Sequence, residues 1–414
     1  MRRFFIHFFL LLFALNVSAQ VRTHLPYSIF GIGEINPKGL SRNLGMGKTG
    51  IANASGHYLN NLNPASYHDL DSISFFFDFG LGVDIVKYET SFDTQHGHDF
   101  NIKDIAMGYK IAKNWTGGLG IVPFSTVGYK ITSTKNVEGT TDLFTADLTG
   151  SGGLTQFYLD NAFVLFHHLS LGATASYVFG TINSSETVQY DQISGLITSS
   201  KTANVNKILV DFGFQYFFNL NKDSRLSIGG VFGNTHKLNF TEELKISQSN
   251  GQIFEEKVTQ QGTFDFPFYI GGGLSLDMSN KISINADYMF RNWSAVNENS
   301  TNTQFSYVNT NAYRIGVEYI PGRMNEYGFM GRIAYRAGFY HEGYYVEINN
   351  KSIDETGFSL GFGIPFMKNK TTVNVSYNSG VRGSISNGLI RERYHSILVS
   401  FSLHDWWFIK TKFD

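Results

Sequence analysis

Residues Arg42 to Tyr67 read RNLGMGKTGIANASGHYLNNLNPASY, and this stretch decides how the rest of the chain is interpreted. It is rich in glycine and asparagine and has no apolar period of helix or strand length. Directly after it, the sequence changes to a long series of alternating strands. Irregular backbone is tolerated at membrane depth only where protein or a water-filled lumen surrounds it. We therefore expect residues 20–70 to form a polar plug, or hatch, inside a barrel formed by residues 71–414.

The N-terminus has the three parts of a secretory signal peptide. Arginines at positions 2 and 3 precede an apolar run over residues 4–15, and small residues occupy positions 17–19. The apolar run is shorter than the roughly 20 residues that a spanning helix needs. We predict that residues 1–19 are removed and that the mature protein is integral to the outer membrane of a Gram-negative cell.

The composition excludes several classes of function. The 414 residues carry a net charge of −1, which gives no electrostatic reason to expect nucleic acid as a partner. The chain has no cysteine, which excludes disulfides, thiolate catalysis and cysteine-ligated metals. Its 43 glycines stand beside only 7 prolines, a mixture that suits many strands with small residues at crowded positions.

From Asp71 onward, apolar and polar residues alternate with a period of two. In the first segment Phe75 and Phe77 alternate with Ser74 and Asp78. A soluble sandwich also alternates, so the spacing of the segments decides more. Short turns and long polar gaps alternate between fourteen segments, as in outer-membrane barrels. The expected strands are residues 72–85, 99–111, 116–131, 154–166, 169–181, 204–218, 225–246, 266–277, 281–291, 310–320, 329–341, 353–365, 371–380 and 391–404.

The predicted fold is therefore all-β: a 14-stranded antiparallel transmembrane β-barrel with an N-terminal hatch inside the lumen. The long gaps are rich in serine, threonine, asparagine and glutamine, and we expect them to be loops that face the medium. They are residues 86–98, 132–153, 182–203, 247–265, 292–309, 342–352 and 381–390.

Charged residues of the predicted strands share one parity, which we assign to the lumen because a charge facing lipid at the midplane costs about 2–4 kcal/mol. They are Asp78, Asp84, Asp211, Asp287, Arg314, Glu318, Arg332 and Arg336. Two interpretations stay open: these groups pair with one another or with the plug, or they select solutes. Aromatic residues near the strand ends predict interfacial girdles. These are Tyr109, Trp115, Trp293, Trp406 and Trp407.

No stretch of the sequence has the residue spacing that a catalytic or cofactor-binding motif requires. Residues 47–49 read Gly-Lys-Thr, like the end of a phosphate-binding loop, but Arg42 stands where the first glycine is needed and no buried strand precedes it. Two histidine pairs lack a third ligand in sequence reach, and no serine nucleophile elbow is present. These pairs are His96 with His98 and His167 with His168. We predict no enzyme activity, no cofactor and no metal site.

Pro123 falls within the third predicted strand. Because proline donates no hydrogen bond to the ladder, it marks a bulge, an edge or a gap in pairing. With Gly128 following, a kinked strand could leave an opening through the barrel wall. The alternative is a simple bulge near the rim.

Five places in the sequence together resemble the FadL-type outer-membrane transporters, the long-chain fatty acid and hydrocarbon uptake barrels, and within them the members from Bacteroidota. Residues 42–54 are similar to the family's R-x-x-G-M-G-x-x-G-x-A opening, and Asn63-Pro64-Ala65 to its N-P-A hatch motif. Val122-Pro123-Phe124 is similar to the P-F of the third strand. The remaining places are Asp287-Tyr288 through Asn292-Trp293-Ser294, and Tyr313 to Tyr319 with Arg336-Ala337-Gly338-Phe339.

The resemblance implies a hydrophobic ligand that is captured from outside, held against the hatch, and released sideways through a gap at the third strand. The implied ligand and hatch residues are Asn63, Pro64, Ala65, Gly45, Met46 and Gly47, and the implied lateral-gap residues are Pro123, Phe124 and Gly128. The implied partners are outer-membrane lipid and a hydrophobic small molecule.

Two functions stay open. The first is an outer-membrane transporter for hydrophobic or amphipathic small molecules, with hatch gating and lateral release. In fatty-acid transporters, however, two external loops carry apolar helical elements that form a capture groove, whereas residues 182–203 and 247–265 are mostly polar. The second function is a plugged barrel that serves as a structural or accessory subunit of a larger outer-membrane protein assembly, in secretion or barrel assembly, with an outer-membrane protein partner.

Overall fold

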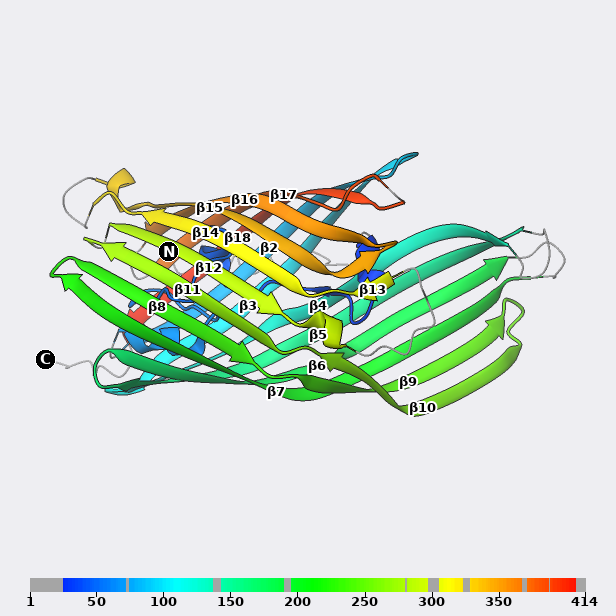
Figure 1. Cartoon of the computed structure of the whole chain (residues 1–414), viewed down its shortest axis with the longest axis horizontal. Helices are drawn as coiled ribbons and strands as arrows, with labels where there is room; N and C mark the ends of the chain where they lie inside the picture. The colour runs from blue at the N-terminus through cyan, green and yellow to red at the C-terminus, as the bar shows by residue number, and fades with distance from the viewer. Residues whose placement is uncertain are drawn as a thin grey trace, which may run out of the picture.

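A computed structural model of the chain contains one closed antiparallel β-barrel (Figure 1). It describes residues 25–71, 74–136, 143–189, 195–279, 281–296, 305–322, 328–366, 371–386 and 388–406. The predicted signal peptide and Trp407 lie outside the described residues. No helix among the described residues is long and apolar enough to cross a membrane.

The sheet has eighteen strand segments, which occupy fourteen positions in the barrel wall. The fourteen-stranded prediction is thus confirmed. The wall strands are β2 (Ser74–Glu89), β3 (Thr94–Ala112), β4 (Trp115–Asn136), β5 (Leu143–Leu165), β6 (Leu169–Gln189), β7 (Ile197–Asn221), β8 (Ser224–Gly233), β11 (Tyr269–Met278), β12 (Ile282–Arg291), β14 (Thr310–Tyr319), β15 (Ala334–Ile348), β16 (Lys351–Phe366), β17 (Thr371–Arg382) and β18 (Arg391–Trp406). Four further segments adjoin these strands. Strand β9 (His236–Gln248) continues β8, β10 (Ile253–Phe266) leads into β11, and β13 (Phe305–Tyr307) leads into β14. Strand β1 (Glu34–Ile35) precedes the wall strands in the sequence.

The barrel closes where the last strand meets the first wall strand. Strand β18 pairs with β2 from Arg391 opposite Glu89 to Trp406 opposite Ser74. Tight turns join β3 to β4, β5 to β6 and β7 to β8 at one end of the barrel, which we call the short-turn end. The opposite end, where several strands run on past the closed wall, is the long-strand end.

Alternation sorts the side chains between the two faces of the wall, as the sequence predicts. On β7, Asp211 and Gln215 are buried, whereas Phe212 and Phe214 are exposed. The same holds around the barrel, so its outer surface carries a belt of apolar side chains. Members of this belt include Ile121, Leu159, Leu171, Ile208, Ile228, Ile270, Leu274, Ile315, Phe339, Phe358, Leu360 and Ile397.

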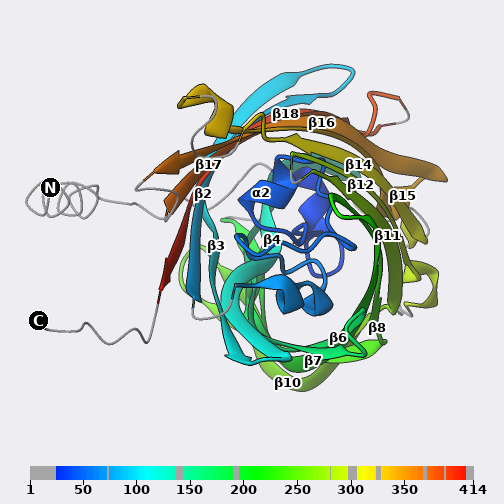
Figure 2. The ribbon, with the colours of Figure 1, turned by 90° about the vertical axis from the view of Figure 1, so that its left-hand side faces the viewer.

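The N-terminal segment, residues 25–71, lies inside the barrel (Figure 2). It contains the short helices η1 (Pro26–Ile29), α2 (Ser41–Leu44) and η2 (Pro64–Asp69), joined by irregular chain. We call this segment the plug. The irregular backbone of the plug is tolerated in the lumen because the wall surrounds it and supplies hydrogen-bond partners.

Glycines of the wall let the plug backbone approach the strands closely. A Cβ atom added to Gly338 would lie 2.2 Å from the amide nitrogen of Gly47, and one added to Gly172 would lie 2.3 Å from that of Ala65. No ordinary Cβ contact is that short, so any larger residue displaces main chain. The glycine content of the chain therefore serves in part to fit the plug.

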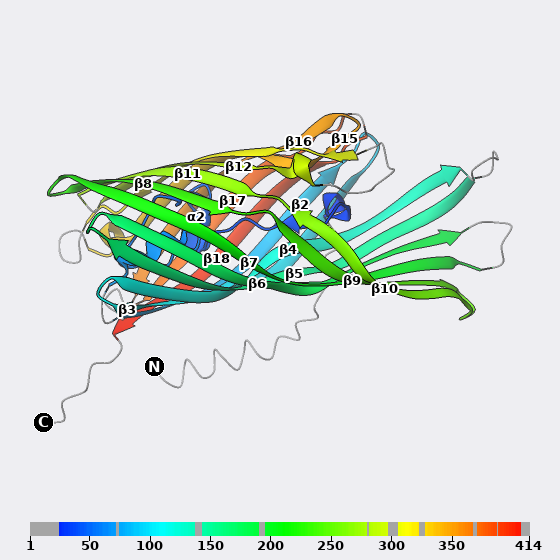
Figure 3. The same cartoon turned by 60° about the horizontal axis from the view of Figure 1, so that its bottom comes forward.

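Six segments form a sheet that projects beyond the closed wall at the long-strand end (Figures 1 and 3). We call this the projecting sheet; its order is β4, β5, β6, β7, β9 and β10. The prediction that residues 132–153, 182–203 and 247–265 are loops is wrong, because most of them continue these strands. Likewise, turns of a few residues stand within the predicted loops 86–98 and 342–352. The projecting strands carry many polar residues, apart from buried apolar ones such as Leu238 and Phe264, so the lipid-facing alternation that marks a strand in the sequence is weak there.

We expect Gly338→Ala to loosen the plug, because the new methyl group displaces the backbone at Gly47. The measurement is limited proteolysis of the purified barrel in detergent, with cleavage within residues 42–70 as the readout. Gly343→Ala on the same strand is the matched control, because its nearest atom lies 3.7 Å from the added Cβ. Equal protection of the plug in both variants would contradict this account.

Candidate functional site

The plug is held to the wall by ionic groups that are buried in the lumen. Glu318 on β14 accepts hydrogen bonds from Arg42 of the plug, with N–O distances of 2.7 and 3.1 Å, and from Arg336 on β15 at 2.6 Å. All three side chains are buried. The ring of Tyr58 lies 5.0 Å from the Arg42 guanidinium and 5.6 Å from that of Arg336. One carboxylate therefore joins the plug to two wall strands.

The other predicted lumenal charges of the wall are also paired. Asp287 accepts the backbone N–H groups of Gly50 and Ile51, at 2.7 and 3.1 Å, and Asp211 pairs with Lys38 at 2.8 Å. Within the wall, Asp84 pairs with Lys103, Arg314 with Glu342, and Asp78 accepts a hydrogen bond from Ser402. These contacts favour the interpretation that the charges pair with one another or with the plug rather than select solutes.

Arg332 does not belong to this set. The sequence predicts it within a strand beginning at residue 329, whereas β15 begins at Ala334. Arg332 instead ends the short helix η4 (Met330–Arg332) at the short-turn end, where its guanidinium lies 5.7 Å from the ring of Phe329. The prediction of a lumenal position within a strand is therefore wrong.

Asn63, Pro64 and Ala65 fix the plug at its C-terminal part. The Asn63 side chain caps η2 by accepting the N–H of Ala65 at 2.9 Å. Its amide donates to the carbonyl of Ile51 in the plug at 2.7 Å and to that of Phe214 in β7 at 3.0 Å. The hydroxyl of Ser170 donates to the Ala65 carbonyl at 2.8 Å. The structure thus gives the Asn-Pro-Ala motif a role in anchoring.

Gly45, Met46 and Gly47 also pack against the wall. Met46 is fully buried, and the N–H of Gly47, which has a positive φ of 67°, donates to the hydroxyl of Ser359 on β16 at 2.6 Å. None of the three lines either of the two lumenal cavities described below. The structure does not bring these residues to a ligand-sized space.

The wall has an opening beside the third predicted strand. Strand β4 pairs with β3 only from Trp115 to Ile121, and its pairing with β5 shifts register at Pro123. Beyond Ile121, the two edges of β3 and β4 separate. Pro123 thus lies at a register shift of the β4–β5 ladder, close to the point where the pairing of β4 with β3 stops.

Residues 25–36 of the plug occupy this opening. Strand β1 pairs with β4, with Glu34 opposite Thr126 and Ile35 opposite Ser125. The N–H of Asn36 donates to the carbonyl of Phe124 at 3.0 Å, and the N–H of Leu25 donates to that of Gly128 at 2.6 Å. Two of the three predicted lateral-gap residues, Phe124 and Gly128, are therefore hydrogen-bonded to the chain's own N-terminal segment.

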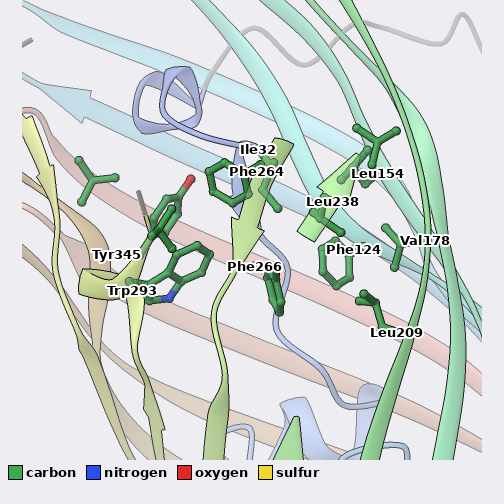
Figure 4. Packing of buried hydrophobic residues seen from close by; sticks show 13 residues of the cluster. Ile32, Phe124, Leu154, Val178, Leu209, Leu238, Phe264, Phe266, Trp293 and Tyr345 are labelled. Carbon is green, nitrogen blue, oxygen red and sulfur yellow. The ribbon is translucent and has the colours of Figure 1, made fainter. Parts of the chain in front are cut away.

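An apolar cluster fills the lumen towards the long-strand end (Figure 4). Ile32 of the plug packs there among Phe124, Phe264 and Phe266 from the wall, and Trp293 stacks on Tyr345 with ring centroids 4.4 Å apart. The prediction that Trp293 belongs to an interfacial girdle is wrong. Strand β12 ends at Arg291, and the short helix η3 (Trp293–Ala295) places this side chain in the cluster at 1% exposure. Tyr109 and Trp115 are exposed.

A cavity of about 200 Å³ remains in the lumen between this cluster and the plug. Phe124, Leu209 and Phe266 line its apolar side. The opposite side is ionic: Arg382 pairs with Glu355 at 2.6 Å and with Glu34 of the plug at 2.8 Å. The cavity is amphipathic, and sequence reasoning missed Arg382 because its partners lie far apart in the chain.

A larger vestibule of about 1590 Å³ opens at the short-turn end. Asp69 of the plug and Arg225 of β8 form an ion pair at its edge, with an N–O distance of 3.1 Å. Burial raises the pKa of Asp69, but the Arg225 guanidinium together with His68 and Lys110 outweighs this effect and holds that pKa below its ordinary value. The carboxylate thus stays ionised and pairs the plug with the wall.

Comparison with solved structures defines the class of fold as a FadL-like β-barrel. The Pseudomonas putida toluene transporter TodX matches with a TM-score of 0.61 at 14% identity, over 91% of this chain and 100% of that one. The Ralstonia pickettii toluene transporter TbuX matches with 0.57 at 17% identity, over 89% and 99%. A Pseudomonas aeruginosa FadL homologue matches with 0.56 at 11% identity, over 91% and 100%.

Comparison of the sequence with family models identifies the family. The model of the BamG family matches residues 1–414, so the chain belongs to the BamG family. No curated protein matches the sequence. The FadL-type resemblance is therefore confirmed for the fold, while the family carries another name.

We expect Glu318→Gln to lower the free energy of unfolding, because two buried guanidiniums then lose their shared carboxylate. Breaking a buried ion pair by removing one partner costs about 3–5 kcal/mol. The measurement is the denaturant concentration at the midpoint of unfolding in detergent micelles, with the loss of heat-modifiable migration as the readout. Lys201→Gln is the control: its pair with Glu242 is largely exposed and is worth about 0–1 kcal/mol. Equal midpoints for the two variants would refute the role of Glu318.

Proposed function

We propose that this protein is a plugged outer-membrane barrel that serves as an accessory subunit of a larger outer-membrane protein assembly. The observation that carries the proposal is the occupied wall opening: residues 25–36 are hydrogen-bonded to β4 where a lateral exit would lie. The apolar belt on the outer surface supports insertion in a bilayer. Membership of the BamG family, whose name points to barrel assembly, supports the same role.

The contents of the lumen favour an assembly role over transport. A plug held by the Arg42–Glu318 pair and by Asp287 gives up buried ionic contacts if it leaves the barrel. The remaining cavity is walled on one side by Arg382 and Glu355, so a wholly apolar solute there would meet buried ionic groups on that side. Under this proposal, the plug stays inside the barrel permanently.

The projecting sheet supplies a surface for a partner. A spanning strand needs about 9–11 residues, whereas β5 has 23 and β7 has 25. The excess residues lie beyond the closed wall and on the side that we assign to the medium. A transporter of small molecules has no need of so long an extension, whereas a subunit of an assembly can dock through it.

Purification from outer membranes in mild detergent tests this role. We expect native mass spectrometry to give a complex of fixed stoichiometry with components of the barrel-assembly or secretion machinery, and lipid extraction to give no bound acyl chain or hydrocarbon. Depletion of the protein is expected to lower the amounts of other outer-membrane barrels. A monomeric protein that carries a bound hydrophobic molecule would refute the proposal.

The second candidate is uptake of a hydrophobic small molecule with hatch gating and lateral release. The interrupted pairing of β3 with β4 favours it, because such a gap lets an apolar solute enter lipid directly. The matched structures TodX and TbuX are toluene transporters. In this mechanism residues 25–36 would have to leave β4 and expose Pro123, Phe124 and Gly128.

A disulfide across the opening separates the two candidates. The chain has no cysteine, and Ile35 lies opposite Ser125, with Cα atoms of such pairs about 4.5–5.5 Å apart. We expect the oxidised Ile35→Cys, Ser125→Cys variant to keep normal levels of outer-membrane barrels, because the segment need not move. The reduced form and the two single variants are the controls. Loss of toluene uptake on oxidation alone would instead establish lateral release.

A further inference from the structure

Three side chains with metal-binding atoms converge at the short-turn end of the barrel. They are His57 and Asp71 of the plug and His404 of β18, and one ligand atom of each lies within 4.8 Å of the others. Asp71 Oδ2 lies 3.5 Å from His57 Nδ1 and 3.9 Å from His404 Nε2. Sequence reasoning missed this group because more than three hundred residues separate His404 from the other two.

Each of the three residues is placed by contacts of its own. The N–H of Asp71 approaches the carbonyl of Gly56 at 3.4 Å, which brings the carboxylate next to His57. His404 lies opposite Phe76 in the β18–β2 ladder, and the two rings stack at 4.5 Å with an interplanar angle of 12°. The arrangement therefore follows from the plug backbone and from the strand pair that closes the barrel.

We propose that His57, Asp71 and His404 bind a zinc ion. In a tetrahedral zinc site with bond lengths of about 2.0–2.1 Å, neighbouring ligand atoms are about 3.4 Å apart. The separations from Asp71 are 3.5 and 3.9 Å, and the two histidine nitrogens lie within 4.8 Å of each other, so side-chain rotations that bring the two imidazoles closer complete the site. Two imidazoles and one carboxylate suit zinc, whereas calcium and magnesium prefer oxygen ligands only.

The surroundings leave the fourth position of the zinc ion to water. All three residues line the vestibule of about 1590 Å³, and His57 is largely exposed to it. The hydroxyl of Ser74 hydrogen-bonds to His404 Nε2 at 2.8 Å, and zinc replaces this bond when it takes the same nitrogen. The bound ion then ties the plug directly to β18.

Zinc titration of the metal-free full-length protein in detergent tests the site. We expect one equivalent to bind by calorimetry, and cobalt in its place to give visible absorption bands of a tetrahedral complex. His404→Gln and Asp71→Asn are each expected to weaken zinc binding at least tenfold, since each removes one of three ligands. His167→Gln is the matched control, because His167 is exposed in the β5–β6 turn at the same end of the barrel.

A second readout follows the plug itself. Zinc is expected to slow proteolysis within residues 42–70 of the native chain and to leave the rate unchanged in His404→Gln, while both proteins keep the heat-modifiable migration of a folded barrel. Equal zinc affinity in the native chain and in His404→Gln would overturn the proposal. So would the absence of stoichiometric binding at micromolar zinc. Neither result bears on the assembly role, which the disulfide and complex experiments test separately.

Discussion

The constraint on which this structure depends is that charges buried in the barrel need partners. Glu318 lies between Arg42 and Arg336. Removing one partner of a buried ion pair leaves an uncompensated buried charge, which is strongly destabilising. Because Arg42 comes from the plug, the wall cannot satisfy its own lumenal groups without it. The plug and the barrel wall therefore form one folded unit, because the buried charges of each are paired by the other.

The same reasoning applies to the backbone at the wall opening. Where β3 and β4 separate, the N–H and C=O groups of β4 lack the neighbour that barrel closure normally provides. Unsatisfied backbone groups cost several kcal/mol each in a lipid environment. Residues 25–36 supply the missing partners through β1 and through the contacts of Leu25 and Asn36. The N-terminal segment thus completes the wall where the pairing of β3 with β4 stops.

Much of the fold could be predicted from the sequence because it depends on local patterns. Alternation with a period of two gives the wall strands, and the parity of residues such as Asp211 and Asp287 gives the lumenal face. Contacts between distant segments could not be predicted in this way. Neither the pairing of Arg382 with Glu34 nor the meeting of His57 with His404 leaves a pattern within a single stretch of sequence.

Two errors show where local patterns mislead. Trp293 was assigned to a girdle because it follows a strand, yet the chain turns into the lumen at η3 and buries it. The extensions of β5 and β6 were assigned to loops because strands that leave the bilayer lose the apolar face by which they are recognised. The missing information is the direction in which the chain turns after β12 for Trp293, and the depth in the membrane for the strand extensions; alternation encodes neither.

The length of β5 also has a consequence for the cell surface. Of its 23 residues, about ten suffice to span the bilayer, and the remainder extend about 40 Å at roughly 3.3 Å per residue. With the usual tilt of such strands, this places the end of the projecting sheet about 30 Å beyond the hydrocarbon. A macromolecule that approaches the barrel from this end therefore meets the projecting sheet before it reaches the closed wall.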